Sequence, residues 1–216
     1  MGKVNAKGDQ VVNSVIRITG YSSILFVLLI LLFLLREGLP ALASTPLKTL
    51  FSARWYPIEG YYGILPLILG SLLVTIAATL IALPFGIGTA VFLSEVAPPW
   101  LRDILKPIVE ILAGIPSVVL GFIGILVFAP FIRRFLDIPT GLTAFTGAFL
   151  LGLISIPTIV SVAEDALNTV PNSYRQAALA LGATEWQTIW NVTLPAAKSG
   201  VLTAVMLGIG RSMGET

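Results

Sequence analysis

The longest uncharged stretch of the chain, residues 63–94, contains no Asp, Glu, Lys or Arg in thirty-two consecutive positions. The ~30 Å hydrocarbon core of a bilayer needs only about 20 helical residues. A helix of this length must therefore tilt, kink or project beyond the bilayer. The composition agrees with a membrane location, because 56% of the 216 residues are hydrophobic and only 11% are charged, against roughly a quarter in soluble proteins. The chain is an integral membrane protein.

Further apolar segments predict additional spans. Residues 21–35 carry no charge and predict the first span. A third is expected over about 107–131, a fourth over about 139–163, and a fifth starts at 196 and runs to the last residue. The third should bend or break at Gly114-Ile115-Pro116-Ser117, because proline removes a backbone donor. The expected fold class is all-α, a polytopic membrane protein with five visible transmembrane helices.

The amino-terminal part of the chain is expected to form three segments. Residues 1–20 are polar, residues 21–35 form the first transmembrane helix, and residues 36–62 form a loop rich in Pro, Ser, Thr and aromatic residues. A cleavable signal peptide is the alternative for the start of the chain. A basic segment, an apolar core and Ala41-Leu42-Ala43 follow one another in the order that such a peptide requires.

The basic residues give a weak indication of orientation. With the amino terminus in the cytoplasm, seven lie inside and five outside, which slightly favours this topology by the positive-inside rule. The loop 36–62 is then extracytoplasmic and residues 169–195 are cytoplasmic. The inside group is Lys3, Lys7, Arg17, Arg102, Lys106, Arg175 and Lys198, and the outside group is Arg36, Lys48, Arg54, Arg133 and Arg134.

The chain contains no cysteine and no histidine. Disulfides, thiolate chemistry, the usual zinc sites and imidazole acid–base catalysis are therefore excluded, and we predict no catalytic residue, no metal site and no cofactor. The sequence also lacks a G-x-x-x-x-G-K-[ST] loop, so the chain does not itself bind ATP in the P-loop manner. Its thirteen Lys and Arg residues are scattered, which argues against a nucleic-acid partner.

Residues 169–195 have the pattern of two short, water-facing helices. Ser173 with Gln176, and Thr184 with Gln187, each have the spacing of a capping box at a helix start. Gly182 lies where the first helix should end, because glycine adopts the left-handed cap conformation without steric cost. A polar helix pair inside membrane sequence predicts binding of a soluble partner.

The spacing within this segment resembles the cytoplasmic EAA motif of permease subunits of type I ABC importers. The motif consists of Gln176-Ala177-Ala178, Gly182 and Val192-x-Leu194-Pro195, and the spacing agrees at every position. Gln176 replaces Glu and Val192 replaces Ile. An ordinary amphipathic helix pair at the membrane surface is the alternative, which explains the caps but not the full spacing.

Three further segments resemble the phosphate-specific, PstC-type branch of that family. They are Leu83-Pro84-Phe85-Gly86 through Phe92-Leu93-Ser94-Glu95, Gly114-Ile115-Pro116-Ser117-Val118-Val119-Leu120-Gly121, and Gly210-Arg211-Ser212-Met213-Gly214-Glu215-Thr216. The resemblance covers the chain from about residue 63 to its end. It implies an ABC type-1 transmembrane domain over 63–216, incomplete because family members continue into a further transmembrane helix. The chain is therefore expected to be truncated at its C-terminus.

The resemblance also implies partners, a location and a set of residues in contact with them. The partners are a second homologous permease subunit, a dimer of ATP-binding cassette ATPases that hydrolyse the ATP, and an extracytoplasmic phosphate-binding protein. The location is the bacterial or archaeal plasma membrane, with several spans in the lipid bilayer. The implied ATPase-coupling residues are Ser173, Tyr174, Arg175, Gln176, Ala177, Ala178, Gly182, Ala183, Leu194 and Pro195.

Two ionisable residues are expected deep in the last span. If Lys198 marks the inner interface, a rise of 1.5 Å per residue places Arg211 roughly 20 Å along the helix. Charges at that depth normally face protein or a watery path, and arginine suits an oxyanion because its guanidinium stays charged and bonds two oxygens at once. Glu215, one turn away, is predicted to hold Arg211 when the anion is absent. The alternative is a salt bridge or snorkelling pair near the outer surface.

Together these features predict the channel-forming permease subunit of an ATP-driven importer of inorganic phosphate, with Arg211 and Glu215 in the substrate path. A type I ABC permease for another anion or small solute is the first alternative. An uncoupled channel, a secondary transporter or a membrane enzyme is the second, although no nucleophile and base form a pair that would support an enzyme.

Overall fold

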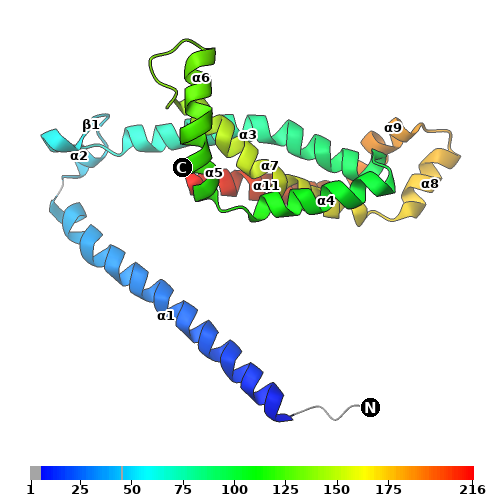
Figure 1. The fold of residues 1–216 in the computed structure, drawn as a ribbon, viewed down its shortest axis with the longest axis horizontal. Helices are drawn as coiled ribbons and strands as arrows, with labels where there is room; N and C mark the ends of the chain where they lie inside the picture. Colours follow the sequence, from blue (N-terminus) through cyan, green and yellow to red (C-terminus); the bar gives the residue numbers. More distant parts are fainter. Residues whose placement is uncertain (1–5, 45) are drawn as a thin grey trace. The chain divides into compact units, whose positions relative to one another are not determined.

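The computed structural model describes residues 6–44 and 46–216. Residues 1–5 of the predicted segment 1–20, with Lys3, lie outside the described residues. The chain divides into two compact units, Met1–Pro66 and Leu67–Thr216, and each is described by itself (Figure 1).

The first unit begins with α1 (Ala6–Ser44), a helix of 39 residues. Its part Gln10–Pro40 is long and apolar enough to cross a membrane, so it extends the predicted span 21–35 at both ends. The amino-terminal extension has a simple cause, because Val11, Val12 and Val15 continue the exposed apolar surface that a bilayer can cover.

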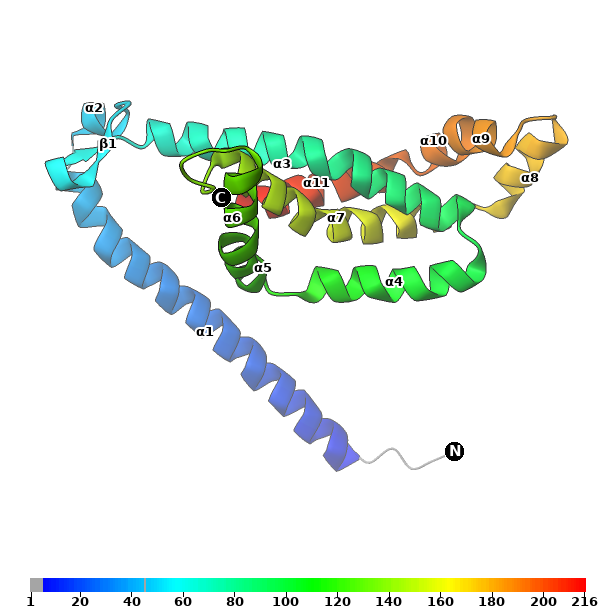
Figure 2. The same cartoon turned by 45° about the horizontal axis from the view of Figure 1, so that its top comes forward.

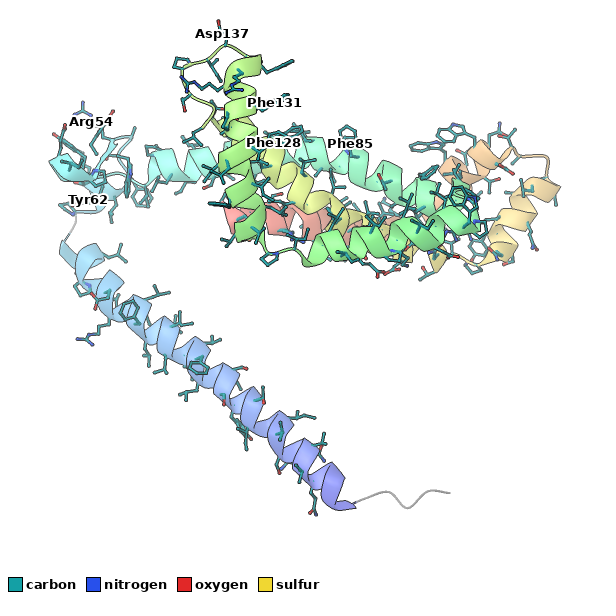
Figure 3. All side chains as sticks on the ribbon, viewed as in Figure 1. Arg54, Tyr62, Phe85, Phe128, Phe131 and Asp137 are labelled. Carbon is teal, nitrogen blue, oxygen red and sulfur yellow. The ribbon has the colours of Figure 1, made fainter. Side chains whose placement is uncertain are left out.

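A small hairpin follows α1 and the short helix α2 (Leu47–Leu50). The strands β1 (Trp55–Tyr56) and β2 (Tyr61–Tyr62) pair antiparallel around the 3₁₀ turn η1 (Pro57–Glu59). Gly60 makes the turn possible with a left-handed φ of 79°. The guanidinium of Arg54 lies 5.8 Å from the centre of the Tyr61 ring, within the range of a cation–π contact. Arg54 and the neighbouring Tyr62 are labelled in Figure 3. The loop predicted for 36–62 therefore contains ordered structure.

The uncharged run 63–94 forms a long helix. α3 (Leu65–Val91) passes through Pro84 and continues into a π-helical turn, η2 (Phe92–Val96). The turn ends where the N–H of Ala97 donates to the carbonyl of Phe92 at 2.7 Å. Single π turns inside helices are frequent at functional sites.

The predicted third span, 107–131, has wrong bounds. α4 (Pro99–Gly114) is a separate helix, and the candidate span is Ser117–Phe135, made of α5 (Ser117–Ile123), η3 (Gly124–Phe128) and α6 (Ala129–Phe135). The predicted break after Gly114 is confirmed. Ile115 is extended, with φ −67° and ψ 129°, because the residue before a proline is sterically kept out of the helical region.

The fourth candidate span is α7 (Ala144–Asn168). It starts five residues later than predicted, because Thr143 caps it by accepting a hydrogen bond from the N–H of Thr146 at 3.2 Å. The remaining elements are α8 (Asn172–Ala180), α9 (Glu185–Thr188), the π turn η4 (Ile189–Thr193), α10 (Leu194–Ala196) and α11 (Lys198–Glu215).

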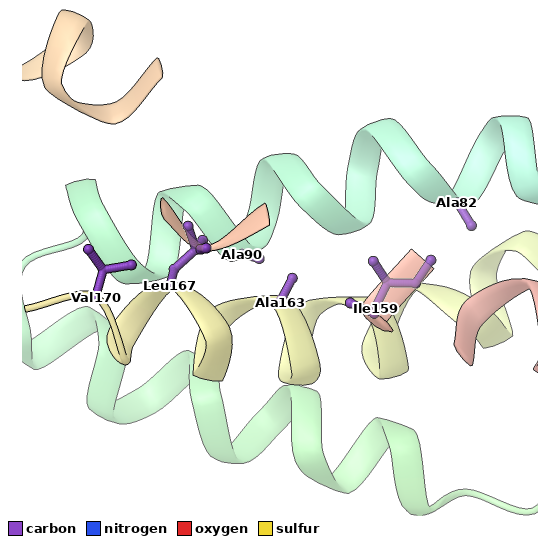
Figure 4. Close-up of a cluster of buried hydrophobic side chains, with 8 residues drawn as sticks. Ala82, Ala90, Ile159, Ala163, Leu167 and Val170 are labelled. Atoms are coloured by element: carbon purple, nitrogen blue, oxygen red, sulfur yellow. The ribbon is translucent and has the colours of Figure 1, made fainter. Parts of the chain in front are cut away.

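α7 is the central helix of the second unit. Figures 1 and 2 show it beside α3, α4 and α11, with α8 and α9 at the end remote from the C-terminus. Figure 4 shows Ile159, Ala163 and Leu167 on the face of α7 that is turned toward α3. Close approach depends on glycines: a Cβ at Gly86 of α3 would lie 2.7 Å from Ile159, and one at Gly208 of α11 would lie 2.5 Å from it.

The second unit also has an aromatic cluster away from this core. Phe128 of η3 stacks on Phe149 of α7 with ring centres 5.1 Å apart, and Phe128 meets Phe131 edge-on (Figure 3). These contacts fasten the α5–α6 span to α7. Beyond α6, Asp137 adopts a φ of 50°, so the loop after the span makes a tight left-handed turn.

Within residues 6–44 and 46–216, four helices are long and apolar enough to cross a membrane. There is a fifth candidate span if two helices that meet at an angle of 75° count as one, namely Glu185–Ala196 and Lys198–Glu215. Large apolar side chains are exposed along these helices, as expected where lipid replaces water. The prediction of an all-α polytopic membrane protein is confirmed.

Candidate functional site

The first helix of the segment 169–195 starts at Asn172, directly after Pro171. Pro171 has an extended ψ of 138°, which suits the residue before a helix. The predicted cap of Ser173 with Gln176 is wrong, because Ser173 lies inside the first turn and no side-chain cap bond exists in the described helix α8. The proline fixes the start of the helix before Ser173 is reached.

The end of α8 and the start of α9 agree with the prediction. Gly182 has a φ of 86°, and its N–H donates to the carbonyl of Leu179 at 3.0 Å, while the N–H of Ala183 donates to Ala178 at 3.1 Å. These are the two bonds of a Schellman motif. At the start of α9, Thr184 accepts from the N–H of Gln187 at 3.2 Å, and the Gln187 side chain accepts from the N–H of Thr184 at 2.9 Å. The second capping box is therefore confirmed.

The helix pair presents an apolar surface to solvent. Leu181 at the turn is 90% exposed and Tyr174 is 54% exposed. A hollow of about 530 Å³ lies between α8, the turn that follows it and η4, and is lined by Tyr174, Ala177, Ala178, Leu181, Ala183 and Val192. Gln176 is exposed beside it, whereas Ala178 is buried. An exposed apolar hollow at the end of a polar helix pair is a surface that a partner protein can cover.

Two further predicted coupling residues, Leu194 and Pro195, differ in their surroundings. Leu194, in α10, packs against the buried cluster of the second unit. Pro195 is exposed in α10, close to the end of the helical run Glu185–Ala196. Leu194 therefore anchors this end of the segment to the second unit.

Arg175 does not face outward. Its Nε donates to Oε2 of Glu95 at 2.9 Å and one terminal nitrogen donates to Oε1 at 2.5 Å. Side-chain exposure is only 19% for Arg175 and 7% for Glu95. The hydrogen bonds to Glu95 raise the pKa of Arg175, against the opposing effect of burial. A direct contact of Arg175 with a partner is therefore not supported by the geometry.

Arg211 lies at the far end of α11, partly buried. One terminal nitrogen donates to Oγ1 of Thr158 on α7 at 2.6 Å, and the other lies 3.5 Å from the carbonyl oxygen of Ala113 at the end of α4. The predicted pairing with Glu215 is not formed: none of the ion pairs among the described residues involves Arg211, and Glu215 is exposed. Glu215 lies near the end of the helix, where solvent competes for its carboxylate. Arg211 binds Thr158 instead.

Polar contacts that the sequence did not indicate lie on the same helices. The hydroxyls of Ser155 and Ser212, each 1% exposed, are 2.8 Å apart and join α7 to α11. Glu164 of α7 is 2% exposed and pairs with Lys106 of α4 at 2.7 Å. The available signal was the presence of Ser and Glu within apolar helices, where such residues need partners. Among the described residues, no group of three His, Cys, Asp or Glu side chains could hold a metal ion.

The sequence is similar to known membrane proteins. Residues 82–216 match the family model described as binding-protein-dependent transport system inner membrane component. The chain is 46% identical over 173 residues to the probable ABC transporter permease protein YqgH of Bacillus subtilis, covering 79% of this chain and 56% of that protein. It is 36% identical over 218 residues to the phosphate transport system permease protein PstC of Xylella fastidiosa, covering 90% of this chain and 67% of that protein.

The chain thus spans 56% and 67% of the lengths of these two relatives. A solved structure of the MetNI methionine ABC transporter, in inward-facing conformations, contains a chain of similar fold. The TM-score is 0.60 at 23% sequence identity, and the match covers 70% of this chain and 72% of that one.

Proposed function

Because the chain belongs to the family of binding-protein-dependent transport system inner membrane components, we propose that it is a channel-forming permease subunit of an ATP-driven importer of inorganic phosphate. Residues 63–216 form its transmembrane domain, and residues 169–195 form its coupling helices. The amino terminus and the coupling helices are cytoplasmic, and the segment between α1 and α3 is extracytoplasmic. The protein lies in the plasma membrane as a multi-pass subunit.

The observation that carries this proposal is that Arg211 has no carboxylate partner among the described residues. It lies in α11, which we propose as the last span, yet both of its hydrogen-bond partners, Thr158 and Ala113, are neutral. No carboxylate lies within 4.0 Å of it in the part of the chain that the structure describes. A charge left without a counter-ion inside a membrane protein favours an anion, and a guanidinium has five N–H donors, of which these bonds use two.

Phosphate is the anion that the relatives favour. The protein of Xylella fastidiosa that is similar over 90% of this chain is named a phosphate transport permease. The structure similar to this chain at 23% identity belongs to a methionine transporter, and at that identity it supports the fold without selecting a substrate. A permease for another anion remains the alternative that a substrate test decides.

The apolar hollow between α8 and η4 supports a role in coupling. An ATPase subunit that covers Tyr174 and Leu181 would remove their exposed surface from water. ATP-driven closure of an ATPase dimer then moves the coupling helices, and a second homologous permease subunit completes the pore. An extracytoplasmic binding protein delivers phosphate, and ATP hydrolysis occurs in the separate ATPase subunits.

The test is purification of the tagged protein from its native membrane. The proposal predicts that an ATP-binding subunit copurifies and that ATP hydrolysis by the complex rises when phosphate and the binding protein are added. Absence of an ATPase from the complex would favour an uncoupled channel or secondary transporter. Stimulation by a different anion, without stimulation by phosphate, would favour the alternative substrate.

A further inference from the structure

We infer that a chain of polar side chains transmits the movement of α8 to α4 and α7, the two helices that hold Arg211. This inference rests on the proposed function, because it assumes that a partner ATPase moves α8. The polar chain consists, in order of contact, of Arg175, Glu95, Ser94, Asn168, Glu164 and Lys106.

The first link fastens α8 to two other elements. Arg175 donates to both carboxylate oxygens of Glu95 in η2. It also donates to the carbonyl of Leu167, in the last turn of α7, at 3.1 Å and to that of Val170, just after the helix, at 2.7 Å. One guanidinium therefore joins α8 to η2 and to α7, and a bidentate pair of this kind fixes orientation as well as distance.

In the middle of the polar chain Ser94 and Glu164 are buried and Asn168 is exposed, and Ser94 has two alternative acceptors. The hydroxyl oxygen of Ser94 lies 3.1 Å from Oε1 of Glu95 and 3.0 Å from Oδ1 of Asn168. Because a hydroxyl has one hydrogen, it donates to only one of these acceptors at a time. Asn168 in turn donates to Oε1 of Glu164 at 2.5 Å.

The last link reaches α4. Lys106 donates to Oε2 of Glu164 at 2.7 Å. Arg102, one turn earlier on α4, donates to the carbonyls of Leu93 at 2.6 Å and Ser94 at 2.5 Å. The π turn η2 is therefore bound by Arg102 of α4 and by Arg175 of α8. Arg102 supplies donors for carbonyls in the last turn of the helix, which lack partners within it.

α4 and α7, the helices that Lys106 and Glu164 join, also contact Arg211 through Ala113 and Thr158. Thr158 belongs to α7 and Ala113 is near the last residue of α4. Separating a buried charge from its partner is strongly unfavourable. When α8 moves, α4 and α7 must therefore follow or the polar chain must break. If α4 and α7 follow, the groups that hold Arg211 move with them.

The experiment uses the assembled complex in proteoliposomes and measures the amount of radiolabelled inorganic phosphate imported per ATP hydrolysed. The variants are Glu95→Gln, Lys106→Met and the double variant, with Lys198→Met as the matched control, since Lys198 is an exposed lysine outside the polar chain. We expect each single variant to retain its ATPase subunit and to lower the ratio by between about twofold and thirtyfold. The double variant should lose no more than the worse single variant, because both interrupt one path.

A wild-type ratio in both single variants would overturn the inference, as would losses that multiply in the double variant. Should Glu95→Gln fail to assemble, Arg175→Lys provides the test, since lysine keeps the charge but cannot form the paired bonds; a wild-type ratio there would also overturn it. A wild-type complex that does not couple ATP hydrolysis to phosphate import would overturn the proposed function and this inference together. A coupled wild-type complex with equally coupled variants would overturn the inference alone.

Discussion

Lys106 forms ion pairs with two adjacent carboxylates that differ in burial. Its ammonium lies 2.7 Å from Glu164, whose side chain is 2% exposed, and 3.0 Å from Asp165, whose side chain is 65% exposed. The same cation therefore has one partner inside the protein and one at its surface.

This difference predicts unequal effects on stability. Glu164→Ala should lower the free energy of unfolding by about 2 kcal/mol, less than for a fully buried pair because Lys106 is itself 35% exposed. Asp165→Ala should cost less than about 1 kcal/mol, as surface pairs do. Denaturant titration of the purified chain in detergent measures both, and equal effects of the two variants would contradict the structure.

The same pair has a defined dependence on pH. The pKa of Lys106 is raised above its ordinary value of 10.5, chiefly by the hydrogen bond to Glu164, with burial acting in the opposite direction. Since the folded-state pKa exceeds the unfolded one, the stabilisation is complete below pH 10.5 and is lost as pH rises through the folded-state pKa. The difference in stability between wild type and Lys106→Met should be constant from about pH 7 to about pH 9 and shrink above 10.5. Lys106→Arg stays charged at these pH values and should therefore keep the stabilisation above pH 10.5. A difference between wild type and Lys106→Met that already shrinks between pH 7 and 9 would count against the ion pair.

Two glycines of α3 are predicted to respond differently to the same substitution. A Cβ at position 86 would lie 2.7 Å from Cγ2 of Ile159, whereas one at position 88 would have no described atom within 4 Å. Gly86→Ala should therefore destabilise the chain by about 1 to 3 kcal/mol through overpacking. Gly88→Ala should be neutral or stabilising by up to about 1 kcal/mol, since alanine favours helix. Melting in detergent compares the two, and a stable Gly86→Ala variant would show that α3 and α7 pack less closely.

The exposed apolar turn of the coupling helices is predicted to contact the ATPase. Leu181→Asp should weaken copurification of the ATP-binding subunit by more than about tenfold, because a central apolar contact typically contributes at least 1 to 2 kcal/mol. Folding should be unaffected, since Leu181 is 90% exposed. Ile58→Asp is the matched control, because Ile58 is a fully exposed apolar residue in the other unit. Undiminished copurification with Leu181→Asp would place the contact elsewhere.

Local signals in the sequence predicted local structure well. The left-handed turn at Gly182, the capping box at Thr184 and the break before Pro116 each depend on residues within one helical turn of each other. Such features follow from backbone sterics and nearby hydrogen bonds, which a single sequence displays directly. The failed cap at Ser173 shows the limit, because a proline two positions earlier also starts a helix and the two signals compete.

The pairing of charges over long distances could not be predicted in this way. Arg175 and Glu95 are eighty positions apart, and nothing in their spacing indicates that η2 and α8 meet. Arg211 was expected to use Glu215, its neighbour on the helix, but it binds Thr158 on α7. The packing of α4, α7 and α11 decides these contacts, and it depends on glycines and small residues whose role appears only in three dimensions.

The central claim, that Arg211 binds phosphate in the path of an ATP-driven importer, is tested most directly by phosphate uptake into proteoliposomes that contain the assembled complex. We predict ATP-dependent accumulation of radiolabelled phosphate with the wild-type chain and a fall of more than about tenfold with Arg211→Ala, since a charge-assisted bond typically contributes 1.5 to 3 kcal/mol. The ATPase subunit should still copurify, and Arg134→Ala should transport normally. Wild-type uptake by the Arg211→Ala complex, or no ATP-dependent uptake by the wild-type complex, would contradict the claim.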